Sequence, residues 1–262
     1  MPVDTYIDQA RTRVQAEQDA VDEKRETYKT FINRVTELQT DPASSPSSGM
    51  TATTGTHLAV NSSPDDHCRT VRTVFAETIR PHSIDDIDGS ESLLETIRGE
   101  FTDTIAVALA PPTDTSFTPE LKQMVIAEAQ ARHSEATALQ KALDREQRQL
   151  EETGNVVDDI TAWIAEVDET PLTDLGFDAL ARRHKQLATH RNQCEELAHQ
   201  RQDFLQGTTN NSIEVGVRHQ SLVPYLYQDF PVDHPVLVTV VRLDDTCKDC
   251  QRTVRDHLIR RV

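Results

Sequence analysis

The 262-residue chain contains little glycine, few aromatic residues and no long hydrophobic run. It has eight glycines and no G-x-S-x-G, P-loop or G-x-G-x-x-G motif, so we do not expect a glycine-rich phosphate-binding loop. The longest apolar stretches, 105–110 and 236–241, fall well short of the roughly 20 residues that a membrane-spanning helix needs. The first residues are neither basic nor followed by a signal-peptide core. We therefore expect a cytoplasmic protein with reduced cysteines.

Lysine is also scarce, since only six of the 27 basic residues are lysine, and the net charge is −17. Such a balance is typical of a protein adapted to molar salt, where a Debye length of about 3 Å screens self-repulsion. An ordinary acidic cytosolic protein is the alternative interpretation. The one basic cluster (Arg252, Arg255, Arg260 and Arg261) suits the negative end of a helix dipole better than a nucleic acid. We do not expect nucleic-acid binding.

Apolar residues recur at seven-residue intervals near the N-terminus: Ile7, Val14, Val21, Tyr28 and Val35. This heptad pattern predicts a helix over 5–38, roughly 50 Å long at 1.5 Å per residue. A helix of that length must pack along another long helix, from the same chain or from a second copy.

The remaining pattern predicts more helices at 64–79, 90–109, 119–152, 156–167 and 175–206. Thr153-Gly154 and Gly207 are expected to end two of them. Residues 213–217 fit a weak strand or an extended arm. Residues 236–243 fit a buried strand or a helix capped by Asp233, and the helix is preferred because a lone strand has no partner.

The predicted fold class is therefore all-α, an elongated helical bundle with coiled-coil-like long helices and a short C-terminal capping segment. The predicted organisation is an N-terminal heptad helix (1–40), a flexible linker rich in Ser, Thr, Pro and Gly (41–62), a helical bundle (63–207) and a C-terminal segment (208–262).

Cys247 and Cys250 form the only cysteine motif with a spacing that chemistry commonly uses. On a helix the two thiols would share one face and could bind zinc. Two further ligands would have to come from Cys68, His67, Cys194, His199 or His257, and Cys68 could be brought in by tertiary packing. A redox pair and simple packing are the alternatives. We expect both Cys68 and Cys194 on the inward faces of their helices, where cysteine behaves as a small hydrophobe.

Tyr225, Tyr227 and Phe230 form an aromatic patch close to the C-terminus. Aromatic residues are enriched at protein interfaces. The same residues could instead plug the end of a helical bundle, and both interpretations stay open.

Three segments carry a resemblance to known sequences: 67–72 (His-Cys-Arg-Thr-Val-Arg), 222–232 (Leu-Val-Pro-Tyr-Leu-Tyr-Gln-Asp-Phe-Pro-Val) and 247–252 (Cys-Lys-Asp-Cys-Gln-Arg). Together they resemble an uncharacterised haloarchaeal family, a domain of unknown function, over 63–262. The resemblance implies a source and a compartment, and it supplies no activity or site residues.

We expect a non-catalytic helical interaction or scaffold protein that binds a protein partner or self-associates through its heptad helix. No cofactor is expected apart from the candidate zinc, and no small-molecule substrate can be identified. The first alternative is a metal- or thiol-dependent regulator that uses Cys247 and Cys250. The second is an enzyme with an unrecognised site between helices, although the sequence has no two Glu-x-x-His motifs that would build one.

Overall fold

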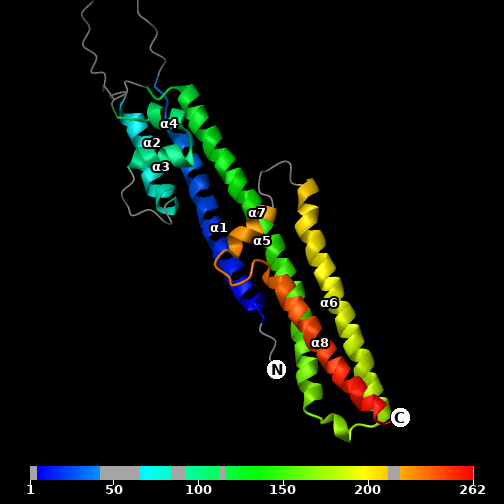
Figure 1. Ribbon diagram of the computed structural model, residues 1–262. Helices are drawn as coiled ribbons and strands as arrows, with labels where there is room; N and C mark the ends of the chain where they lie inside the picture. Colours follow the sequence, from blue (N-terminus) through cyan, green and yellow to red (C-terminus); the bar gives the residue numbers. More distant parts are fainter. Residues whose placement is uncertain (1–4, 42–64, 84–91, 112–115, 212–218, 262) are drawn as a thin grey trace, which may run out of the picture. The chain divides into compact units, whose positions relative to one another are not determined.

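The computed structural model describes residues 5–41, 65–83, 92–111, 116–211 and 219–261, and every regular element in these ranges is a helix (Figure 1). The elements are α1 (Ile7–Glu37), α2 (Asp65–Thr78), η1 (Arg80–His82), α3 (Leu93–Glu100), α4 (Asp103–Ala108), α5 (Pro119–Asp168), η2 (Leu172–Asp174), α6 (Phe177–Asn211), α7 (His219–Leu226) and α8 (Pro235–Ile259). The all-α prediction is confirmed. None of the helices in these ranges is both long enough and apolar enough to cross a membrane.

The chain forms two compact units, and both α1 and α5 contribute to each of them. The continuous unit is Ala20–Thr137, and the discontinuous unit combines Met1–Asp19 with Ala138–Val262. These bounds differ from the four segments expected from the sequence. Apart from Asp41, the expected linker lies outside the described residues.

The predicted heptad helix is present as α1, and it folds back on its own chain. All five heptad positions, Ile7, Val14, Val21, Tyr28 and Val35, are buried. They are therefore not exposed for contact with a second copy.

Three phenylalanines form the centre of the continuous unit. Phe31 of α1 lies 6.0 Å from Phe75 of α2 and 5.5 Å from Phe101, and Phe75 and Phe101 lie 5.4 Å apart between ring centroids. Such aromatic pairs add to the stabilisation from burial alone. Cys68 is buried in the same core, as expected.

The single helix expected at 90–109 is instead two short helices. Phe101 leaves helical geometry at φ −114° and ψ −116°, which turns its ring into the core. Thr102 then caps α4, because its side chain accepts a hydrogen bond from the Ile105 N–H at 3.3 Å. The apolar periodicity continues across this break, which is why it predicted one helix.

The two helices expected at 119–152 and 156–167 are one helix, α5, of 50 residues. Gly154 does not end it. A Cβ atom at Gly154 would lie 2.1 Å from an Arg11 guanidinium nitrogen, which donates to the Leu150 and Glu151 carbonyls at 3.4 Å. The absence of a side chain at Gly154 therefore leaves room for the Arg11 side chain to lie across α5.

The C-terminal segment is not a short cap but the 25-residue helix α8, which packs along α6. Its N-cap is His234 rather than Asp233, and Pro235 occupies its first turn. Helix α6 continues through Gly207 to Asn211. The weak strand expected at 213–217 lies outside the described residues.

Candidate functional site

Helices α6 and α8 bring Cys194 and Cys247 together inside the discontinuous unit. Leu180, Leu187, Cys194 and Arg201 are buried at seven-residue intervals along α6. The side chains of Cys194 and Cys247 hydrogen-bond to each other, and both are buried. Cys247 therefore meets a cysteine of another helix, a partner that the sequence motif did not indicate.

Three hydrogen bonds next to this pair hold the two antiparallel helices in register. Arg191 donates to Asp244 at 3.0 Å and to Gln251 at 3.3 Å. Gln251 in turn donates to the His184 carbonyl at 3.3 Å. These bonds join two residues that precede Cys194 on α6 to residues before and after Cys247 on α8, and they help to hold the thiols opposite each other.

The shared hydrogen bond makes the two thiols unequal. The bond from Cys247 lowers the pKa of Cys194 below its ordinary value, because a donated hydrogen bond stabilises the thiolate. The pKa of Cys247 is raised by the same bond and by burial. Cys194 is therefore the thiol of the pair that ionises first.

A cavity of about 470 Å³ reaches the Cys194 side of the pair. Its lining includes the two alanines Ala188 and Ala198 of α6, and Val240 and Asp244 of α8. The small alanine side chains leave the space that a small solute needs to approach Cys194.

Cys250, one turn along α8 from Cys247, faces a different cavity. It is half-buried beside Trp163 and Leu187 in an apolar cavity of about 310 Å³ at the end of α5. Burial raises its pKa, which makes its thiol a weaker nucleophile at neutral pH.

The proposed zinc ligands do not form a cluster. Cys247 and Cys250 are one turn apart on α8, whereas Cys68 belongs to the core of the continuous unit. Among the described residues, no three His, Cys, Asp or Glu side chains form a group that could hold a metal ion. Zinc binding by Cys247 and Cys250 stays a prediction.

The aromatic patch divides between the core and the surface. Tyr227 is buried, and Phe230 is half-buried against it with ring centroids 5.1 Å apart. Tyr225 remains 47% exposed. Its hydroxyl donates to Glu17 at 3.0 Å, and the Arg13 guanidinium lies 5.8 Å from its ring centroid.

The buried hydroxyl of Tyr227 belongs to a polar network with Glu146 and Arg201. It donates to Glu146 of α5 at 2.6 Å, and Arg201 of α6 forms two bonds of 2.8 Å to the same carboxylate. The side chains of Arg201 and Glu146 are 2% and 0% exposed. Glu146 and Arg201 each occupy an inward position on an otherwise apolar helix face. Two opposite charges at such positions are the sequence signal that could have indicated a buried ion pair.

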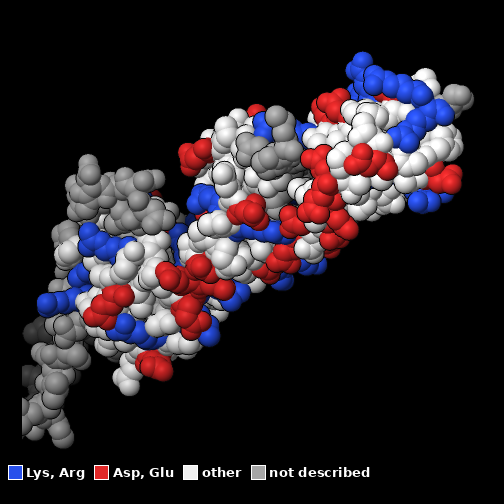
Figure 2. Space-filling view, turned by 90° about the horizontal axis from the view of Figure 1, so that it is seen from below, with Lys and Arg blue, Asp and Glu red and all other residues white. Residues whose placement is uncertain are grey.

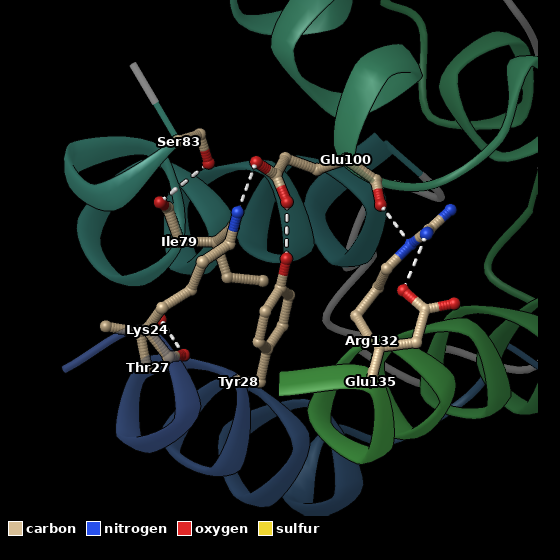
Figure 3. A network of polar contacts seen from close by, with 8 residues as sticks. All are labelled: Lys24, Thr27, Tyr28, Ile79, Ser83, Glu100, Arg132 and Glu135. Carbon is tan, nitrogen blue, oxygen red and sulfur yellow. Dashed lines mark hydrogen bonds and ion pairs between the residues drawn. The ribbon is translucent and has the colours of Figure 1, made fainter. Parts of the chain in front are cut away.

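The continuous unit contains a second network, centred on Glu100 at the end of α3 (Figure 3). The Glu100 carboxylate accepts hydrogen bonds from Lys24, at 3.2 Å, and from the Tyr28 hydroxyl. Arg132 of α5 donates to the Glu100 carbonyl at 2.8 Å. The network ties α1, α3 and α5 together, and we interpret it as structural.

A family model matches residues 5–251 of the chain, and its description is a domain of unknown function, DUF7260. The chain belongs to the DUF7260 family. The expected membership of a family of unknown function is confirmed, and the DUF7260 match also includes α1, which lay outside the expected 63–262. No curated protein and no solved structure matches the chain.

Proposed function

We propose that this DUF7260 protein is a non-catalytic helical interaction protein that self-associates, with Tyr225 at the centre of the contact. The observation that carries the proposal is that Tyr225 is exposed while the chain segment around it is firmly anchored. Tyrosine and arginine are, with tryptophan, the residues enriched among those that dominate the binding energy of interfaces.

Tyr225 is held firmly because α7 and the turn after it bury the side chains on both sides of the exposed residues. Leu226 and Tyr227 are buried, and Tyr227 is bonded to Glu146. Pro224 and Tyr225 between the buried positions are exposed. Tyr225 is held in place by Glu17 and Arg13, so little side-chain entropy would be lost on binding.

A second copy is the partner whose charges this surface fits. Arg13 and Glu17 lie 3.5 Å apart beside Tyr225. In a two-fold contact each patch meets its own copy, so Arg13 of one chain can approach Glu17 of the other. Molar salt screens such exposed pairs, which leaves the apolar area of Tyr225 as the main source of affinity.

The test is the molar mass of the full chain by light scattering in molar KCl across a dilution series. We expect the wild type to form a dimer. Tyr225→Ala should raise the dissociation constant of this dimer at least about 30-fold, which corresponds to a hot-spot loss of about 2 kcal/mol. Phe177→Ala is the matched control, because Phe177 is an aromatic residue 51% exposed on the same unit.

Two results would contradict the proposal. A wild-type chain that remains monomeric at every concentration excludes self-association. Equal weakening by Phe177→Ala and Tyr225→Ala excludes Tyr225 as the centre of the contact. Circular dichroism of each variant establishes that the helices remain folded.

We further propose that the protein works in the salt-rich cytoplasm of a haloarchaeon. The support is the net charge of −17 and the preference for arginine over lysine. On the face drawn in Figure 2, acidic and basic side chains are interspersed, and the acidic ones form the larger connected areas. The resemblance of 222–232 to a haloarchaeal family agrees with this source.

Salt adaptation predicts that the melting temperature rises between dilute buffer and molar KCl. The physical reason is that salt screens the repulsion among carboxylates, which is stronger in the compact state than in the unfolded chain. Thermal unfolding followed by circular dichroism measures the change. An unchanged or lower melting temperature in molar KCl would remove this part of the proposal.

A further inference from the structure

We propose that Cys194 and Cys247 form a reversible intrachain disulfide when the protein meets a small peroxide, so that α6 and α8 become covalently joined. This site does not depend on self-association through Tyr225. It rests on two buried thiols that contact each other across two helices, with a cavity beside one of them.

The position of the pair meets the first requirement for a disulfide, which is that the two cysteines face each other on packed elements. Cys194 and Cys247 belong to one core cluster, and Arg191, one turn before Cys194, bonds to Asp244 and Gln251, which lie before and after Cys247. Little movement of the backbone is therefore needed to bring the sulfur atoms into bonding distance.

The cavity beside Cys194 supplies the second requirement, which is access for the oxidant. The side chain of Cys194 is itself buried, yet it lines a space of about 470 Å³ bounded by Ala188 and Ala198. Hydrogen peroxide is small and polar enough to enter a space of this size, which Arg191 and Asp244 also line.

The chemistry balances with hydrogen peroxide as the only co-reactant. The Cys194 sulfur, as thiolate, attacks one peroxide oxygen, the O–O bond breaks, and hydroxide leaves and takes up a proton to become water. The Cys247 sulfur then attacks the sulfenic sulfur of Cys194, the S–O bond breaks, and a second water leaves with the Cys247 proton. Two thiols are oxidised by two electrons in total, and a low-molecular-weight dithiol reverses the reaction by exchange.

The other two cysteines are placed differently. Cys250 faces the cavity beside Trp163, and Cys68 is buried in the core of the continuous unit. The proposal therefore assigns the bond to Cys194 and Cys247 and excludes the C-x2-C pair that the sequence suggested.

Trypsin provides a direct assignment, because its cleavage sites separate all four cysteines. Cys194 lies in peptide 192–201, Cys247 in 243–248 and Cys250 in 249–252, and Lys248 lies between the last two. The full chain is treated with hydrogen peroxide and then denatured in the presence of N-ethylmaleimide, which blocks the free thiols. The monomeric chain is separated from any disulfide-bonded dimer and digested without reductant. Mass spectrometry of the monomeric fraction then identifies any linked peptides.

We expect peptide 192–201 linked to 243–248, at a mass two hydrogens below the sum of the two, with Cys68 and Cys250 carrying maleimide. Dithiothreitol should abolish the linked species. Cys247→Ser should lose it, whereas the matched variant Cys250→Ser, three positions away on the same helix, should retain it.

Other outcomes overturn the proposal. A link from 192–201 or 243–248 to 249–252 would assign the bond to Cys250. A link found only in a disulfide-bonded dimer would make it intermolecular. Maleimide on all four cysteines after peroxide treatment would show that no bond forms. Because the peptide assignment is made on the wild type, it holds even if a cysteine variant fails to fold.

Discussion

Each compact unit contains a carboxylate that accepts a hydrogen bond from a tyrosine and pairs with a basic side chain, but the two carboxylates lie at different depths. In the discontinuous unit, Glu146 is fully buried between Tyr227 and Arg201. In the continuous unit, Glu100 is 14% exposed and meets the buried Tyr28 and Lys24, whose side chain is 37% exposed. The chemical groups are similar, and the surroundings differ.

The difference teaches that depth, rather than the groups themselves, decides what such a network does. A buried ion pair loses its hydration, and only good geometry with further hydrogen bonds compensates for that loss. Glu146 meets this condition with two bonds from Arg201 and one from Tyr227. A pair at the surface stays hydrated and is screened by salt, so it contributes little.

The largest effect that would sharpen this comparison comes from Arg201→Met. The substitution leaves the Glu146 charge buried without its partner, and we expect a loss of about 3 to 5 kcal/mol in the free energy of unfolding. Urea unfolding followed by the fluorescence of Trp163, the single tryptophan, measures it in the same unit.

The matched control replaces the whole network by apolar groups, as Glu146→Leu/Arg201→Met/Tyr227→Phe. This variant should recover most of the loss, because no buried polar group remains unpaired. If Arg201→Met is as stable as the wild type, the two networks do not differ as described, because Glu146 then behaves like a surface carboxylate.

An intermediate effect is expected at alkaline pH. Burial, together with Glu100 and Glu146 respectively, raises the pKa of Tyr28 and of Tyr227 far above the ordinary value of 10.0. Above pH 10 the unfolded chain loses these two protons while the folded chain keeps them, so stability falls as pH rises. The slope is up to about 1.4 kcal/mol per pH unit for each tyrosine.

Urea unfolding at pH 9, 10 and 11 measures this slope. Tyr28→Phe/Tyr227→Phe should show a flatter decline, because the other titrating groups are common to both proteins. Equal slopes in the double variant and the wild type would mean that neither hydroxyl is held neutral by folding.

The smallest effect is expected from Lys24→Met at the Glu100 network. The pair is partly exposed at 3.2 Å, so we expect a loss of about 0 to 1 kcal/mol that fades in molar KCl. Lys29→Met is the control, because Lys29 pairs with Glu26 at 3.1 Å with both side chains largely exposed. A loss as large as that of Arg201→Met would show that depth does not separate the two networks.

The sequence predicted the long helices α1 and α6 well, because each has an apolar face that repeats every seven residues. The helix expected at 5–38 is α1 at Ile7–Glu37, and its five heptad positions are buried. Gly154 was misinterpreted as a helix end because its role depends on Arg11, more than 140 positions away, and no local pattern contains that contact.

The contacts of the candidate residues were harder to predict than the helices, for two different reasons. The C-x2-C spacing indicated Cys250 as the partner of Cys247, whereas Cys194 became its neighbour only through the pairing of α6 with α8. The aromatic patch could have been divided in advance. Residues two apart in a helical turn point to different sides, so this spacing does not place Tyr225 and Tyr227 on one surface.

The discontinuous unit has a consequence for how the chain reaches its fold. Tyr6 donates from its backbone to Thr239 at 3.2 Å, and Glu17 accepts from Tyr225, so the unit is joined by contacts 233 and 208 positions apart. The continuous unit can form as soon as residues up to Thr137 have left the ribosome. The N-terminal turns of α1 must wait for α7 and α8, and contacts of such sequence separation slow folding. We therefore expect the part of the chain that is synthesised first to be among the last to reach its final packing.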